Sequence, residues 1–448
     1  MTDILDPGAS LSSTANGTVI KPRRLSPEAI AARTKKRYAA EARFKAVGLG
    51  GVIIALGLLA LLLFTIVAQG MGAFWQTTVT LPIELSEAEI DPDGTRDPAV
   101  LAKVNYAGLV NDALYNMFPD VEERRARRAL RGIISKGAGI DVQRMVLADP
   151  SLIGTTQDIT LLASDDVDQF VKGNIDRDLP EDNRRVKDQE IVWIDKLVGD
   201  DRVETVFNTW LLTNGDSREP EMAGIWGAAV GSFYMMLVVL MLSVPLGVGA
   251  AIYLEEFAPK NNRWVDLIEV NVNNLAAVPS IVFGLLGLAV FLGVMGLPRS
   301  APIVGGLTLT LMTLPTIVVA TRAALRAVPP SIREGALGIG ASQIQVVAHH
   351  VLPLALPGIM TGTIIGLAQA LGETAPLLMI GMVAFIVDIP SSPFDAATAL
   401  PVQIFLWADA PERAFTERTA AAIMVLLGFL LVMNTLAVIL RQRFQIKW

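Results

Sequence analysis

Cysteine is absent from this chain of 448 residues, and histidine occurs only twice, as His349 and His350. Without cysteine there is no disulfide, no iron–sulfur cluster, no cysteine-based zinc site and no thiol nucleophile. Charged residues are also scarce: they make up 18% of the chain, whereas a typical soluble domain has about 25%. Because 52% of the residues are hydrophobic and the mean hydropathy is +0.48, the composition indicates a membrane protein.

The charges that are present are unevenly distributed. The net charge of −7 gives no sign of nucleic-acid binding over the whole chain. Residues 69–223 hold 29 acidic and 17 basic side chains, whereas the rest of the chain holds 15 acidic and 20 basic ones. An acidic, polar block is therefore inserted into an apolar and slightly basic chain.

Six apolar stretches are long enough to cross a bilayer as helices, which takes about 20 residues each. They predict an all-α polytopic membrane protein with six transmembrane helices. The stretches are residues 46–68, 225–253, 275–297, 302–320, 357–387 and 420–440.

Lysines and arginines near the ends of the spans predict the orientation, because they favour the cytoplasmic side. Residues 1–45 carry nine of them, and more follow the second, fourth and sixth spans. With six spans, all these basic segments lie on one side. We therefore expect a cytoplasmic basic arm at 1–45, an uncleaved first span at 46–68, and both termini in the cytoplasm.

The acidic block at 69–223 is then expected in the periplasm, as an insertion domain between the first two spans. Aliphatic and aromatic residues are spaced through it, and it is long enough for a small folded domain. It has no recognisable catalytic or metal-binding pattern.

The stretch between the fourth and fifth spans predicts a compact helical unit. Ser331 and Glu334 have the spacing of a capping box, in which the hydroxyl and the carboxylate satisfy the first free amides of a helix. Gly340 suits a left-handed helix end, and Ser342 with Gln345 has the spacing of a second capping box. Such a unit, connected to two spans, is suited to bind a partner protein that moves those spans. An ordinary interfacial hairpin would have the same sequence pattern.

This unit also resembles a known motif. Glu334-Gly335-Ala336 is followed after three residues by Gly340 and after nine more by His350-Val351-Leu352-Pro353. The pattern resembles the EAA loop of ABC-importer permeases, with Gly335 in place of alanine and His350 in place of an aliphatic residue. The resemblance implies that the cytoplasmic loop 321–356 docks on an ATPase through the following residues: Ser331, Glu334, Gly335, Ala336, Gly340, Leu352 and Pro353.

Two further segments narrow the family. Residues 273–285 and 370–377 resemble the third-span and fifth-span signatures of phosphate permeases. The similarity covers residues 225–448 and points to the PstA-type subunit of phosphate ABC transporters, in a subgroup with an N-terminal extension. It implies a type I importer permease core in spans two to six.

The resemblance also implies partners. They are a PstC-type permease, a PstB-type ATPase dimer that binds ATP, and a periplasmic PstS-type protein that delivers inorganic phosphate. The chain contains no Gly-x4-Gly-Lys-Ser/Thr phosphate loop, so ATP must be bound by the partner. We expect no catalytic residue, no metal and no cofactor in this chain.

Polar residues within the spans are candidates for the substrate pathway. Glu373 lies in the predicted fifth span, and a carboxylate in the hydrocarbon region suggests function. Its role would be that of a gate residue or of a partner for an arginine. A buried carboxylate that only stabilises helix packing is equally consistent with the sequence. Arg322 at the end of the fourth span either attracts an anion or extends to lipid phosphates. The remaining candidates are Thr310, Thr313, Thr316 and Thr374, although threonines in helices more often bond to a carbonyl of the preceding turn.

Small residues recur every four positions in the fifth span, at Gly358, Gly362, Gly366 and Ala370. This spacing lets two helices approach closely, so we expect a packing ridge rather than a hinge. Taken together, the sequence predicts a permease subunit for ATP-driven import of inorganic phosphate across the bacterial inner membrane. The alternatives are a permease for another oxyanion and, in a different class, a membrane sensor that uses residues 69–223 as its sensory domain.

Overall fold

The computed structural model describes residues 26–259 and 261–444, so that most of the predicted basic arm lies outside the described residues. The chain divides into two compact units, residues 1–64 and residues 65–448. The first unit holds most of helix α1 (Pro27–Gly70). Pro27 and Glu28 favour a helix start, because proline presets the backbone angle and an acid in the first turn complements the helix dipole.

In the second unit, a small α/β domain precedes the main group of spans. Its three-stranded antiparallel sheet has the order β2-β1-β3, with β1 (Trp75–Glu84) between β2 (Thr156–Leu162) and β3 (Val203–Phe207). Leu81 pairs with Ile159 on one side of β1, and Thr78 pairs with Glu204 on the other. The prediction of an all-α protein is therefore wrong for this insertion domain, which we define as residues 71–225.

Helices cover this sheet and complete its core. Leu81 and Ile83 of β1 and Leu114 of α4 are fully buried, and Asn105 caps α4 by accepting a hydrogen bond from the Gly108 amide. The helical elements of the domain are η1 (Met71–Phe74), α2 (Glu87–Ile90), α3 (Pro98–Leu101), α4 (Tyr106–Met117), α5 (Arg124–Arg131), α6 (Ala138–Ala148), η2 (Pro150–Leu152), α7 (Asp165–Val171), η3 (Glu181–Asn183), α8 (Asp188–Gly199), α9 (Thr209–Thr213) and η4 (Pro220–Met222).

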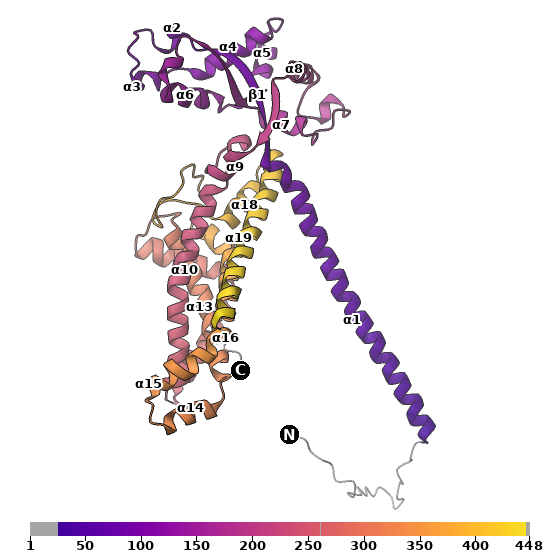
Figure 1. Cartoon of the computed structure of the whole chain (residues 1–448), viewed down its shortest axis with the longest axis vertical. Helices are drawn as coiled ribbons and strands as arrows, with labels where there is room; N and C mark the ends of the chain where they lie inside the picture. The colour runs from indigo at the N-terminus through magenta and orange to yellow at the C-terminus, as the bar shows by residue number, and fades with distance from the viewer. Residues whose placement is uncertain (1–25, 260, 445–448) are drawn as a thin grey trace, which may run out of the picture. The chain divides into compact units, whose positions relative to one another are not determined.

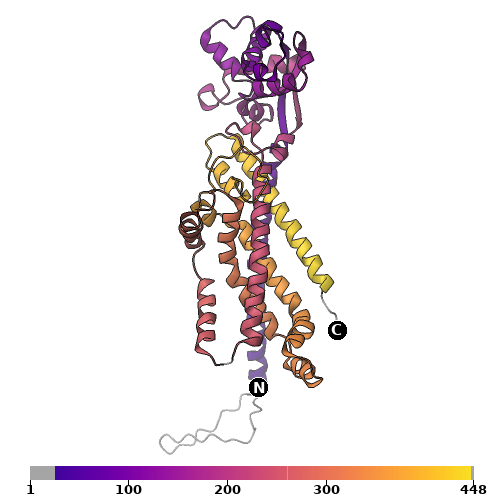
Figure 2. The ribbon, with the colours of Figure 1, turned by 90° about the vertical axis from the view of Figure 1, so that its left-hand side faces the viewer.

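Five helices in the described residues are long and apolar enough to cross a membrane. Besides α1 they belong to α10 (Trp226–Ile252), α13 (Pro302–Arg326), α16 (Leu352–Gly372) and α19 (Ala414–Phe444). Helix α13 packs against α10 and α16, and α16 packs against α19 (Figure 1 and Figure 2).

The predicted third span at 275–297 is not a single helix. Instead, α11 (Arg263–Leu275) and the helical segment Ser280–Val294, which contains α12 (Ser280–Gly287) and the π-helical η6 (Leu288–Val294), are bent by 103° at a short break. The break contains Pro279, which disfavours helical backbone at the residue before it. Six spans are present only if this bent pair counts as one.

The predicted fifth span at 357–387 is also shorter than expected. Helix α16 ends at Gly372, and Glu373 has extended backbone with φ −78° and ψ 124°. The chain then forms only the short α17 (Ala375–Met379) before α18 (Leu400–Ala408). Pro376 lies in the first turn of α17, where proline starts a new helix more readily than it continues an old one.

The small residues of α16 pack as expected. A Cβ built on Gly358 would lie 2.6 Å from the Ala324 Cβ, and one on Gly362 would overlap Ala320. Both alanines belong to α13, so the ridge lets α16 approach α13 closely. The packing interpretation of the four-residue spacing is confirmed at these two positions.

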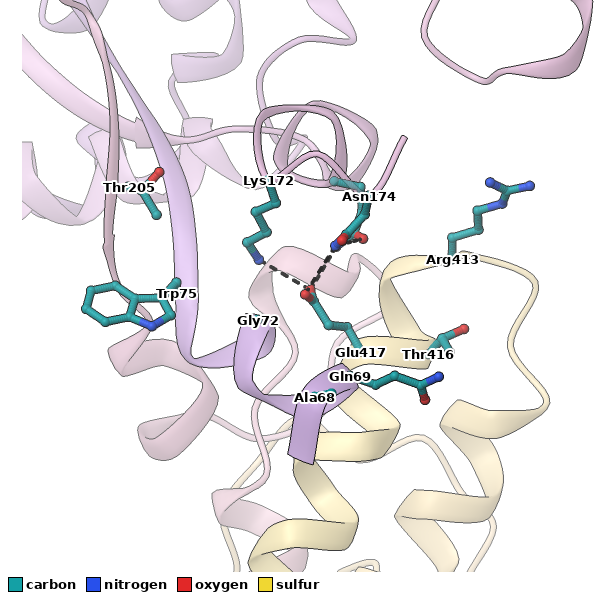
Figure 3. A pocket seen from close by; sticks show the side chains of 11 residues that line it. Ala68, Gln69, Gly72, Trp75, Lys172, Asn174, Thr205, Arg413, Thr416 and Glu417 are labelled. Carbon is teal, nitrogen blue, oxygen red and sulfur yellow. Dashed lines mark hydrogen bonds and ion pairs between the residues drawn. The ribbon is translucent and has the colours of Figure 1, made fainter. Parts of the chain in front are cut away.

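Polar contacts join the insertion domain to the start of α19. Glu417 accepts hydrogen bonds from Gln169 Nε2 at 2.8 Å, from Lys172 Nζ at 3.3 Å and from Asn174 Nδ2 at 3.3 Å. Figure 3 shows the Lys172 and Asn174 side chains converging on Glu417 at the edge of a cavity of about 560 Å³. The next residue, Arg418, is buried and donates to the Ala223 carbonyl at 2.7 Å.

Candidate functional site

The helical loop between α13 and α16, residues 327–351, has the elbow shape predicted from the sequence. Helix α14 (Pro330–Gly338) is followed by Gly340, whose φ is +91°. The next helical turn, α15 (Gln343–Gln345), continues through the π-helical η7 (Val346–Val351) into α16. A positive φ favours glycine, because a Cβ meets the backbone in this conformation. The prediction for Gly340 is confirmed.

The second capping box is present, but the first is not. The Gln345 amide donates to Ser342 Oγ at 3.4 Å, and the Ser342 amide donates to Gln345 Oε1 at 2.9 Å. At α14, however, the N-cap is Pro329, and no side chain in the described part of the chain caps the helix. The predicted box of Ser331 and Glu334 is wrong, because Pro330 starts the helix two residues earlier than predicted and Ser331 falls inside the first turn.

An ion pair fastens this loop to the end of α10. Arg333 donates to the Glu256 carboxylate through Nη2 at 2.6 Å and through Nε at 3.2 Å. The same guanidinium donates to the carbonyls of Val328 at 2.7 Å and Leu325 at 2.9 Å, near the end of α13. Such a two-pronged, charge-assisted contact fixes orientation as well as distance. Arg333 therefore joins α14, α13 and the π-helical η5 (Tyr253–Phe257) in one cluster.

Two further arginines join α13 to η5 and α11. Arg322 Nη2 lies 2.7 Å from Glu269 Oε1 and its Nε lies 3.4 Å from Glu255 Oε2. Arg326 Nε lies 2.9 Å from Glu255 Oε1. Arg322 is buried and paired inside the protein, so it does not extend to lipid phosphates, which corrects that expectation. Its guanidinium is also already neutralised, which weakens the alternative that it attracts an anion.

The three acidic partners Glu255, Glu256 and Glu269 were not among the residues predicted from the sequence. A signal for the first two was present: they stand together directly after the second predicted span. Carboxylates at the edge of a span need cationic partners, and the partners are Arg322, Arg326 and Arg333 at and after the end of α13. The partnership of Glu269 depends on the bend between α11 and α12, which the sequence pattern did not predict.

The helical loop carries three exposed apolar side chains. Leu337 is 53% exposed, Ile339 82% and Ile344 70%. Ala336, in contrast, is buried in a cluster with residues of α13 and η7, and Leu352 packs against the same cluster. Of the other predicted docking residues, Ser331, Glu334, Gly335 and Gly340 are exposed, and Pro353 is half-buried.

The predicted pathway residues do not form one cluster with this loop. Glu373 directly follows the last residue of α16, whereas the loop precedes its first, so α16 separates them by about 30 Å at 1.5 Å per residue. Glu373 and Thr374 are half-buried. Among residues 26–259 and 261–444, the Glu373 carboxylate has no hydrogen bond or ion pair, so the structure provides no arginine partner for it within the described chain.

The hydroxyls of two α13 threonines bond to carbonyls within their own helix. Thr310 Oγ1 donates to the Gly306 carbonyl at 2.7 Å, and Thr313 Oγ1 donates to the Leu309 carbonyl at 3.0 Å. Both are buried, whereas Thr316 is half-buried. The hydroxyls of Thr310 and Thr313 thus bond to the preceding turn, and a role of these residues in a substrate pathway stays a prediction.

Comparison with known proteins decides what kind of membrane protein this is. Residues 243–446 match the family of binding-protein-dependent transport system inner membrane components. Over 225 residues the chain is 33% identical to the phosphate transport system permease protein PstA of Mycobacterium leprae, covering 50% of this chain and 72% of that one. The chain belongs to the binding-protein-dependent transport system inner membrane components. It is thus a multi-pass permease component of an ABC importer, and such a component lacks an ATPase domain.

Other similarities cover smaller parts. A stretch of 156 residues is 37% identical to the probable ABC transporter permease protein YqgI of Bacillus subtilis. It covers 35% of this chain and 52% of that protein, so the chain spans about half the length of this relative. An inward-facing structure of the MetNI methionine ABC transporter is similar over 50% of this chain and 95% of that one, with a TM-score of 0.41 and 17% identity. Residues 31–181 match a domain of unknown function, DUF3333.

Proposed function

We propose that this permease imports inorganic phosphate. The observation that carries the proposal is the 33% identity over 225 residues to a protein described as a phosphate transport permease, PstA. Residues 273–285 and 370–377, which resemble phosphate-permease signatures, lie within the matched permease family region. In this proposal the partners are a PstC-type permease, a PstB-type ATPase dimer and a PstS-type phosphate-binding protein.

The helical loop is the proposed docking point for the ATPase, on the cytoplasmic side of the inner membrane. Its exposed Leu337, Ile339 and Ile344 supply an apolar surface that a partner can bury. Gly340 sets the angle between the two helical segments. The Arg333–Glu256 ion pair then transmits a displacement of the loop to α10, because a two-pronged contact resists both sliding and rotation.

Substrate movement is proposed to involve the break after α16. Glu373 lies where regular helix stops, and its backbone is extended. Irregular backbone at membrane depth is tolerated where it lines a cavity or is buried in protein. A carboxylate repels a phosphate anion, so Glu373 acts in this proposal as a gate residue and not as a phosphate ligand. The insertion domain and both termini keep the orientation expected from the basic residues, periplasmic and cytoplasmic respectively.

Growth and uptake in cells test the substrate. The chain is expressed with the three proposed partner proteins in a bacterium that lacks its own phosphate permeases. Uptake of radiolabelled phosphate is then measured with excess sulfate or molybdate as competitor. Restored uptake that resists these competitors is the expected result. Uptake of another oxyanion without phosphate uptake would make this a permease for that anion, and a membrane-inserted chain that supports no uptake of any anion would favour a sensory role.

A further inference from the structure

The insertion domain contains a cavity of about 470 Å³, a volume typical of sites for small molecules. Its walls come from α4, α5, α6, the start of α7 and the segment around η4. It is distinct from the cavity beside Glu417 in Figure 3, with which it shares no lining residue. Among the described residues, no group of histidines and acids could hold a metal ion, so a metal site is not indicated here.

The charges that line the cavity fall into paired and unpaired sets. Lys136 is paired with Glu219 at 2.9 Å, and Asp166 lies 3.6 Å from Arg185. The lining residues left without an ion pair within the described chain are two acids and two arginines. They are Asp165, Glu221, Arg128 and Arg131.

Glu221 is the group that most needs a partner. It is only 3% exposed, and its Oε2 atom has no hydrogen-bond partner among the described residues. Nearby Arg418 donates to the Ala223 carbonyl instead. Burial raises the pKa of Glu221 to about 7. Ser164 lines the same cavity, and its buried hydroxyl also has no hydrogen-bond partner within residues 26–259 and 261–444. Leaving buried polar groups unpaired is unfavourable.

Arg128 and Arg131 are the two lining cations without an ion pair within the described chain. Arg128 and Arg131 are three residues apart on α5, so they project from neighbouring positions of one helix face. Both are exposed, which leaves their guanidinium donors available at the cavity mouth. Guanidinium groups bind carboxylates and phosphonates through paired hydrogen bonds.

We propose that this cavity binds a small zwitterion, with its ammonium group against Glu221 and Asp165 and its anionic group on Arg128 and Arg131. A plain dianion fits less well, because it would bring its charge next to two carboxylates. A simple amine would satisfy the acids but leave the arginines unused. The chemical class is therefore a small amine that carries a carboxylate or phosphonate, and every residue that lines the site belongs to the insertion domain.

Binding is tested by calorimetry on the full chain in lipid nanodiscs with 2-aminoethylphosphonate as the probe. Inorganic phosphate and ethanolamine serve as the two half-ligands. We expect saturable binding of the probe, and binding of each half-ligand at least about tenfold weaker. Saturation by phosphate at the same concentration as the probe would overturn the proposal, as would the absence of saturable probe binding in the millimolar range.

Variants assign the binding to this cavity. Glu221→Gln and Arg131→Ala should each weaken probe binding at least about tenfold, whereas Arg124→Ala, on the same helix but outside the cavity, should leave it unchanged. Because Arg131 is exposed, its variant remains informative if Glu221→Gln fails to fold. Unchanged binding in Arg131→Ala would contradict the proposal. Since the readout is binding, it is independent of whether the chain transports phosphate.

Discussion

Removing the Arg333 side chain should disconnect the helical loop from α10. In Arg333→Gln, Glu256 loses both guanidinium contacts, at 2.6 and 3.2 Å, and the carbonyls of Leu325 and Val328 lose a donor. The Arg333 and Glu256 side chains are 23% and 8% exposed. Breaking a fully buried ion pair costs about 3–5 kcal/mol. Because Arg333 is partly solvated, we expect a smaller loss of folding free energy, about 2 kcal/mol.

A double-mutant cycle isolates the ion pair. Arg333→Gln, Glu256→Gln and the double variant are compared with wild type in detergent for thermal stability, and in the assembled transporter for ATP hydrolysed per phosphate imported. We expect a coupling energy of about 1–2 kcal/mol and a clear rise in ATP consumed per phosphate in each variant.

The matched control is Arg326→Gln, whose side chain is 57% exposed and pairs with different acids. It should change stability by less than about 1 kcal/mol. Additive effects of Arg333→Gln and Glu256→Gln, together with normal ATP use per phosphate, would refute the idea that this pair transmits movement from the loop to α10.

Three further predictions concern separate parts of the chain. Burial raises the pKa of Glu221 from 4.5 to about 7, so the unfolded chain releases this proton at lower pH than the folded chain does. The free energy of unfolding should therefore fall by up to about 3 kcal/mol as the pH rises from 4.5 to about 7. Glu221→Gln should flatten the dependence of the melting temperature on pH. Gly340 has a φ of +91°, so Gly340→Val should lower the folding stability by at least about 1 kcal/mol and abolish ATPase binding in pull-down assays. In the control Gly338→Ala the new Cβ would meet open space, and this variant should bind the ATPase normally. Glu417→Ala removes an acceptor for three insertion-domain side chains, so limited proteolysis of that domain should be faster than in Thr416→Ala; equal rates would show that Glu417 does not hold the domain.

Local sequence signals predicted the elbow of the helical loop well. Gly340 and the Ser342–Gln345 box succeed because their geometry depends on neighbours within a few residues. The Ser331 prediction failed within the same loop, because two adjacent prolines compete with a serine for the helix start and Pro330 occupies the first helical position.

Features that depend on distant contacts were harder to predict. The hydropathy of residues 275–297 and 357–387 correctly marks them as apolar, but hydropathy does not report the break near Pro279 or the helix end at Gly372. In the insertion domain, β1 pairs with strands about 80 and 130 residues later in the chain, a range that local patterns do not reach.

The candidate site was predicted in part for a similar reason. The loop residues follow a fixed spacing, so a motif finds them. The acidic partners follow no motif. Glu256 pairs with Arg333 of the loop, whereas Glu255 and Glu269 pair with arginines of α13, and these pairings become visible only when α10, α11 and α13 are placed together. The α13 threonines were interpreted more soundly, because their bonds to the preceding turn are local.

The most direct test of the account is phosphate uptake into proteoliposomes that contain this chain with its permease and ATPase partners and the soluble binding protein. The account predicts uptake of radiolabelled phosphate only when ATP is supplied to the ATPase, and its loss in Gly340→Val at equal protein content. Phosphate uptake that persists without ATP, or that is normal in Gly340→Val, would contradict the claim that this permease is driven through its helical loop.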